Sequence, residues 1–119
     1  MLRLFFDHDF NCKILRGLVK RIPDLDFITP NQLGNITESD ENHLVWAFEN
    51  RRVVISHDVN TMTAAANQRL KNGESIFGLI LVPQVMPIGD AIAELEIIIN
   101  CSDENEFENL VKFLPLGLT

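Results

Sequence analysis

The chain has 119 residues, a length that fits one domain and leaves no room for two. Its hydrophobic content of 46% can fill a core of that size, which excludes intrinsic disorder. Seventeen acidic against ten basic side chains give a net charge of −7, and this negative field argues against sequence-specific DNA binding by charge alone. We therefore expect one acidic domain over residues 1–119.

Neither a targeting nor a membrane-spanning segment is expected. The apolar start of the chain is interrupted by Arg3 and reaches Asp7 too soon for a secretory signal. The most apolar later stretch, residues 77–88, is far shorter than a bilayer span. We expect a soluble, cytoplasmic protein without membrane contact. In that compartment Cys12 and Cys101, which form no CxxC motif, are expected to be reduced, half-buried thiols.

Five short apolar runs rich in β-branched and aromatic residues alternate with stretches of helical period. This alternation is typical of a parallel sheet whose strands are joined by crossover helices. We expect an α/β fold with a mostly parallel sheet of four or five strands, helices on both faces and right-handed crossovers. The runs cover residues 2–6, 25–28, 53–55, 77–82 and 111–114.

The first helix is expected to follow Asp9 and to stop at Pro23. A basic stripe at spacings of three and four lies on its outer face, where it would hold a nucleic-acid backbone or simply be solvated. The residues of this stripe are Lys13, Arg16 and Lys20, with Arg21 nearby. The residues expected to face inward are Phe10, Ile14, Leu15, Leu18 and Val19.

The second helix should begin near Ser39, where Thr37 and Asp40 have capping-box spacing, and end before Asn50. The third should cover about residues 59–71, since Asn72 and Gly73 end it. Their apolar faces are expected to be Leu44, Val45, Ala47 and Phe48 in the second helix, and Val59, Met62, Ala66 and Leu70 in the third.

The fourth helix, over residues 88–100, has an apolar arc wide enough to be packed on two sides. This width predicts contact with a second copy in a homodimer, with deep burial inside the chain as the alternative. Ser102 is expected to cap a short acidic helix that runs through Glu108.

Acidic residues follow the first and third strands, Asp7 directly and Asp58 after two further residues. Parallel strands end at one edge of the sheet, and that edge is where open α/β sheets bind ligands. Crossover helices begin at the same edge, so we expect Asp40 and Glu41 to lie there too. Further oxygen ligands, each two residues beyond one of these aspartates, are Asp9 and Asn60.

Two explanations of these acids compete. Each aspartate taken alone is well explained as a helix cap or as a partner of the helix dipole. Several carboxylates at one edge repel one another, however, and a divalent cation relieves that repulsion whereas capping does not. Oxygen ligands without a cysteine cluster favour Mg²⁺ or Mn²⁺ over zinc.

Histidines and threonines accompany the acids. His8, His43 and His57 each lie close in sequence to one of them, which indicates either Mn²⁺ ligation and proton transfer or ordinary hydrogen-bonded histidines. Thr61 and Thr63 open the third helix, where they would position a phosphate or water, or would simply be tolerated.

In this order the residues resemble the small prokaryotic PIN-like proteins, which are described as toxins of toxin–antitoxin pairs or left uncharacterised. The resemblance begins with an apolar strand that runs into Asp7, continues with Ser39, Asp40 and Glu41 before a helix, and then with residues 53–58. It covers nearly the whole chain. Its later elements are Val85, Pro87, Ile88, Gly89, Ala91, Phe113, Leu114 and Pro115.

The resemblance implies a three-layer α/β/α PIN-like fold and a metal-dependent endoribonuclease that uses a metal-bound water as the in-line nucleophile. By position, Asp7, Asp40 and Asp58 match the family's metal-binding and catalytic acids. This chain departs from the family at two places, which weakens a second metal position. They are His8 and Asp9, where Asp-Glu-Asn is common after the first strand, and Asn60, where many members have an acid.

Two other functions remain open at this stage. One is a non-catalytic interaction module with the same fold, which binds an antitoxin-like partner or itself and uses the acids as helix caps. The net charge of −7 and Asn60 favour that alternative. The other is a phosphoacceptor receiver domain, which needs a lysine after its last strand, and residues 115–119 contain none.

Overall fold

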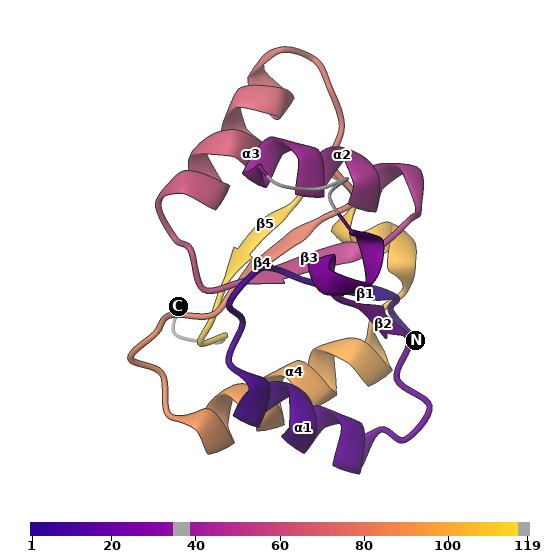
Figure 1. Ribbon diagram of the computed structural model, residues 1–119, viewed down its shortest axis with the longest axis vertical. Coiled ribbons are helices and arrows are strands. Elements are labelled where there is room, and N and C mark those ends of the chain that lie inside the picture. Colours follow the sequence, from indigo (N-terminus) through magenta and orange to yellow (C-terminus); the bar gives the residue numbers. More distant parts are fainter. Residues whose placement is uncertain (35–38, 117–119) are drawn as a thin grey trace.

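The computed structural model describes residues 1–34 and 39–116. Its centre is one five-stranded sheet in which every neighbouring pair is parallel, in the order β2-β1-β3-β4-β5 (Figure 1). The predicted α/β class and parallel sheet are confirmed, and each strand lies on one of the five apolar runs. The strands are β1 (Leu4–Phe6), β2 (Phe27–Ile28), β3 (Val53–Ser56), β4 (Leu79–Leu81) and β5 (Val111–Phe113).

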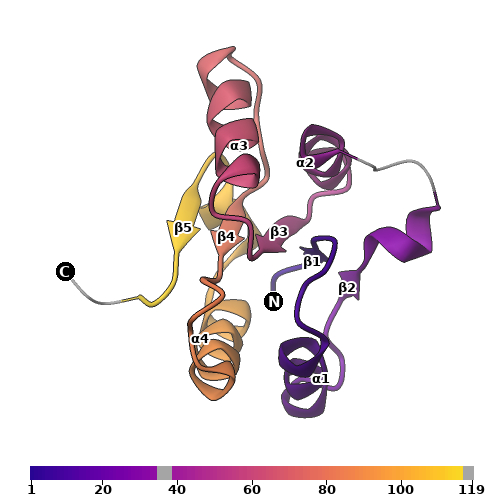
Figure 2. The same ribbon diagram turned by 60° about the vertical axis from the view of Figure 1, so that its left-hand side comes forward.

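Helices cover both faces of the sheet, which gives three layers (Figure 2). On one face lie α1 (Cys12–Arg21) and α4 (Ile88–Cys101), and on the other lie α2 (Asp40–Glu49) and α3 (Thr61–Lys71). Two short 3₁₀ helices, η1 (Pro30–Leu33) and η2 (Glu104–Phe107), lie in the connections to α2 and to β5. None of the described helices is long and apolar enough to cross a bilayer.

The alternation of side chains along the strands divides the core between these layers. In β1, Leu4 and Phe6 pack with α1 and α4, whereas Phe5 between them packs with α2 and α3. All three are at most 1% exposed. Strands that are buried on both faces have no polar face, which explains the continuous apolar runs of the sequence.

The ends of several elements differ from the sequence expectations. Val19 is exposed on α1, and Val59 is exposed before the start of α3 rather than within it. Ser102 is the C-cap of α4 and not the N-cap of the next helix. The N-cap of η2 is Asp103, whose backbone N–H donates to the carboxylate of Glu106. The expected capping role of Thr37 lies outside the described residues. The two cysteines, Cys12 and Cys101, are exposed rather than half-buried.

One crossover has the opposite hand to the others. The connections through α1 and α4 pass over the same face, yet β2 lies to one side of β1 and β5 lies to the other side of β4. The connections through α2 and α3, over the opposite face, share the hand of the first. Since right-handed crossovers are the strong norm, the connection from β4 through α4 to β5 is the left-handed one. The prediction of uniformly right-handed crossovers is therefore wrong.

The apolar arc of α4 is used inside the chain. Ala91, Leu95 and Ile99 are fully buried against the sheet, and Ile92 packs against α1. A β-carbon on Gly17 of α1 would lie 2.4 Å from the Cδ1 atom of Ile92, so the two helices meet at a glycine. The width of the arc is thus explained without a second copy, and a homodimer stays a prediction that these contacts do not test.

Candidate metal centre

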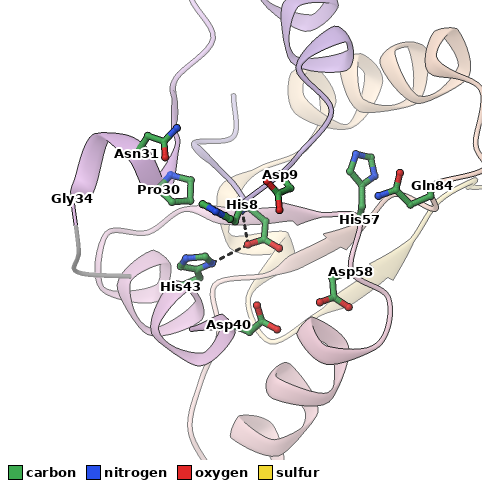
Figure 3. Close-up of a pocket in the computed structure, with 11 residues that line it drawn as sticks. His8, Asp9, Pro30, Asn31, Gly34, Asp40, His43, His57, Asp58 and Gln84 are labelled. Atoms are coloured by element: carbon green, nitrogen blue, oxygen red, sulfur yellow. Dashed lines mark hydrogen bonds and ion pairs between the residues drawn. The ribbon is translucent and has the colours of Figure 1, made fainter. Parts of the chain in front are cut away.

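A cavity of about 750 Å³ opens at the carboxyl edge of the sheet (Figure 3). It lies over β1 and β3. At this point the connections leave toward opposite sides of the sheet, from β1 toward β2 and from β3 toward β4. This is where open α/β sheets form ligand crevices. The described residues that line it are Asp7, His8, Asp9, Pro30, Asn31, Gly34, Asp40, His43, His57, Asp58 and Gln84.

Four of these lining residues are aspartates, and none of the described lining residues is lysine or arginine. Histidines are therefore the only side chains in this group that can carry positive charge. Carboxylates that share a partly enclosed space destabilise one another unless a cation compensates them.

Asp7 is the most buried of the four, with 8% of its surface exposed at the end of β1. Its Oδ1 atom accepts hydrogen bonds from the backbone N–H of His8 at 2.7 Å and from Nδ1 of His43 at 2.9 Å. Its Oδ2 atom accepts from the hydroxyl of Ser56 at 2.6 Å. None of these donors is the free N–H group of a helix terminus, so Asp7 is not a helix cap. One lone pair of Oδ2 remains for a further partner.

Asp58 lies between β3 and α3 and does act as a helix cap. Its Oδ1 atom accepts from the backbone N–H groups of Asn60 at 3.0 Å and Thr61 at 2.8 Å. The hydroxyl of Thr61 donates to its Oδ2 atom. The Thr61 hydroxyl, opposed by partial burial and assisted by these backbone N–H groups, holds the pKa of Asp58 below its usual 3.8. Asp58 therefore stays ionised at neutral pH.

Asp40 is the first residue of α2, but it does not cap that helix. Ser39 does, since its hydroxyl accepts from the backbone N–H of Asn42 at 3.1 Å. The Oδ2 atom of Asp40 instead lies 2.7 Å from the hydroxyl of Thr61, the same hydroxyl that contacts Asp58. One hydroxyl proton thus serves two carboxylates, and it cannot satisfy both fully.

These contacts join residues from four elements. Ser56 at the end of β3 donates to Asp7 and accepts from the backbone N–H of Asp58 at 2.9 Å, and Thr61 at the start of α3 links Asp58 to Asp40. Ligand atoms of Asp7, Asp40 and His43 all lie within 4.8 Å of one another, and Asp58 of the predicted ligands is not in this group. Capping accounts for Asp58 but for neither Asp7 nor Asp40, although the position of Asp40 in the first turn of α2 also suits the helix dipole.

His57 has both ring nitrogens in hydrogen bonds. Nδ1 donates to the backbone carbonyl of Val82 at 2.8 Å, and Nε2 accepts from the backbone N–H of Asn11 at 3.1 Å. The ring also stacks on Phe10, with centroids 4.4 Å apart, and it points away from Asp58 in Figure 3. These contacts fit the hydrogen-bonded alternative for His57, in which the ring ties the β1–α1 loop to the sheet.

The other predicted site residues are divided between the cavity and its surroundings. Asp9 and the exposed His8 line the cavity, whereas the exposed Glu41 and Asn60 do not. Asn60 contributes its backbone N–H to Asp58. The stripe of Lys13, Arg16 and Lys20 is exposed along α1.

Sequence reasoning missed the part that Ser56 plays and gave His43 only a general role. Each forms a hydrogen bond to Asp7 from a residue 49 or 36 positions away in the chain. The only signal was position: Ser56 is the one polar residue of a buried strand, and His43 lies one turn after Asp40 on the face that meets the sheet.

Comparison with protein-family models, with curated proteins and with solved structures finds no match for this chain.

Proposed function

We propose that this protein is a PIN-like, divalent-metal-dependent endoribonuclease whose centre is formed by Asp7, Asp40 and Asp58. One observation supports the proposal above the others: ligand atoms of Asp7 and Asp40, which capping does not explain, lie within 4.8 Å of one another and of His43. The cavity in front of them, at about 750 Å³, has the size of an ordinary ligand pocket.

The donor set fits Mg²⁺ or Mn²⁺. The remaining lone pair of Asp7 and the carboxylates of Asp40 and Asp58 are hard oxygen ligands. Asp40 and Asp58 share the single hydroxyl proton of Thr61, so their negative charges are not fully compensated by hydrogen bonds. His43 donates through Nδ1 to Asp7, so in this arrangement it orients that carboxylate. A bound divalent cation supplies Lewis acidity for the phosphate and an activated water for in-line attack.

A bound cation would also reconcile the protein's charge with an RNA substrate. At a net charge of −7 the chain repels a polyanion, and a bound divalent cation would offset part of the negative charge of the four lining aspartates where the phosphate must approach. We place this activity in the cytoplasm, where the nuclease would be the toxin of a toxin–antitoxin pair and would have a protein antitoxin as its partner.

A second candidate is the non-catalytic interaction module, and the hydrogen bonding of Asp58 favours it. Both Oδ1 bonds of that residue go to the start of α3, as a purely structural cap requires. In that case Asp7 and Asp40 would bind no metal and would lie beside a partner-binding surface.

Cleavage of single-stranded RNA in the presence of Mn²⁺ separates the two candidates. We expect the wild type to cleave and Asp40→Asn to lose at least about tenfold of that rate, because one ligand charge is gone. Glu41→Gln is the matched control: it removes one charge from the same helical turn, outside the cavity, and should keep the activity. Equal rates for both variants, or no metal-dependent cleavage in the wild type, would contradict the proposal.

A further inference from the structure

A smaller hollow of about 290 Å³ adjoins the acidic cavity on the side of α1 and β2. The two share part of their walls, namely Asp7, His8, Asp9, Pro30 and Asn31. The smaller hollow is therefore a direct neighbour of the acidic centre. The residues that line only the hollow are Phe6, Phe10, Cys12, Leu15 and Thr29.

The chemistry of this hollow differs from that of the acidic cavity. Its apolar lining residues are Phe6, Phe10 and Leu15, all members of the apolar core on the α1 face or packed against it. Phe6 is only 1% exposed and Phe10 already stacks on His57, so Leu15 and the remaining surface of Phe10 are what a ligand can contact. Polar groups lie at its border. The Thr29 hydroxyl donates to the side chain of Gln32 and accepts from its backbone N–H, which leaves one lone pair, and among the described residues no hydrogen bond engages the exposed amide of Asn31.

A cation lies at the outer rim of the hollow. Nη2 of Arg16 is 3.4 Å from the sulfur of Cys12, which is one of the lining residues. Among the ion pairs of residues 1–34 and 39–116, none includes Arg16. Its charge is therefore available to an anion from outside, and it is part of the basic stripe on α1.

We infer that the hollow binds one unpaired nucleobase of the RNA, next to the phosphate at the acidic centre, with the following phosphate at Arg16. The hollow shares five lining residues with the acidic cavity, and another of its lining residues, Cys12, contacts Arg16. Unpaired bases bind by stacking on aromatic and apolar side chains and by hydrogen bonds along their edges, which Asn31 and Thr29 can provide. This inference rests on the proposed function and adds a binding subsite to it.

The two cysteines make a direct test. Cys12 lines the hollow, and Cys101 is exposed at the far end of α4, so the chain contains its own reference thiol. The rate of alkylation by iodoacetamide is measured for each by peptide mass spectrometry in the presence of adenosine 5′-monophosphate, both without metal and with Mn²⁺, which offsets the repulsion between the phosphate and the acidic centre. Ribose 5-phosphate is the probe that has the phosphate but no base.

We expect the nucleotide to slow alkylation of Cys12, about tenfold at a concentration about ten times its Kd, and to leave Cys101 unchanged. Ribose 5-phosphate should protect Cys12 much less. Asn31→Ala should weaken protection by the nucleotide, whereas Asn67→Ala, an exposed asparagine on α3, should not. Unchanged alkylation of Cys12, or equal protection by ribose 5-phosphate, would overturn the base subsite.

The result is independent of the metal centre. Metal-dependent RNA cleavage by a protein whose Cys12 is not protected would overturn the subsite and leave the nuclease intact. Protection of Cys12 in a protein that shows no response to Mn²⁺ would support the subsite and contradict the nuclease.

Discussion

Thr61 is the residue whose single hydroxyl matters most to the candidate centre. It contacts the carboxylates of both Asp40 and Asp58, and it is the largest cause of the lowered pKa of Asp58. Its role is to position two acids that would otherwise repel each other without any donor between them.

Replacing this hydroxyl by a methyl group, in Thr61→Val, should destabilise the metal-free protein by about 1–2 kcal/mol. Thr61→Ser keeps the hydroxyl and should restore most of that loss. Chemical denaturation in the absence of divalent cations measures both. Equal stability of the valine and serine variants would show that the hydroxyl does not hold the two carboxylates.

Asp26 provides the clearest dependence of stability on pH away from the centre. Burial raises its pKa. The hydrogen bonds and charges of Arg52 and Arg3, at 2.8 and 3.2 Å, together lower it by more than burial raises it, so that the pKa lies below 3.8. A pKa that is lower in the folded than in the unfolded state stabilises the fold above pH 3.8. That stabilisation disappears as the pH falls through the folded value.

Asp26→Asn should therefore lower the free energy of unfolding near neutral pH by about 0.5–1 kcal/mol, a modest value because the carboxylate is half exposed. The difference from wild type should shrink as the pH falls below 3.8. Urea unfolding at a series of pH values measures it, with the exposed Asp24→Asn as control. A difference that grows in acid would contradict the assignment of this ion pair.

At the scale of elements, the left-handed connection includes a close approach of η2 to the start of β4. A β-carbon on Gly78 would lie 2.7 Å from the Cβ atom and 2.8 Å from the carbonyl oxygen of Phe107. The φ angle of Gly78 is also +132°, which other residues rarely adopt. Gly78 therefore lets the chain pass beneath β4 and add β5 at the edge of the sheet.

Gly78→Ala should destabilise the protein by about 2–4 kcal/mol, because it combines backbone strain with a clash against backbone atoms that cannot move freely. Gly89→Ala is the matched control in α4, where the added carbon meets no atom within 4 Å. That change should be neutral or stabilise by about 0.5–1 kcal/mol. Thermal unfolding measures both variants. Equal melting temperatures would contradict the role of the close contact at Gly78.

At the scale of the whole molecule, the hydrophobic pattern was enough to predict the class of fold. The runs of β1, β3 and β4 are apolar because these strands are buried throughout, whereas the edge strands β2 and β5 are partly exposed. Asp7 and Asp58 followed from where β1 and β3 end. The hand of the last crossover was not predictable, since it depends on the packing of α4 beside α1, where Ile92 meets Gly17, 75 residues earlier in the chain.

Of the candidate centre, the closeness of Asp7 and Asp40 was predictable, but the place of His43 beside them and the hydrogen bonds were not. Strand ends and helix starts can be located along the sequence, which placed Asp40 near Asp7. The donors Ser56 and His43 meet Asp7 only after the sheet and α2 have packed. Whether an acid caps a helix also depends on contacts. Asp58 accepts from backbone N–H groups at the start of α3, whereas α2 is capped by Ser39 and not by Asp40.

The central claim is that Asp7, Asp40 and Asp58 form a cation site, and the melting temperature as a function of Mn²⁺ concentration tests it most directly. A cation that binds only the folded protein stabilises it by mass action, about 2.7 kcal/mol at a concentration one hundred times its Kd. We predict a melting temperature that rises with Mn²⁺ in the wild type and in Glu41→Gln but not in Asp40→Asn. A wild-type melting temperature that does not respond to millimolar Mn²⁺, or an equal response in all three proteins, would contradict the claim.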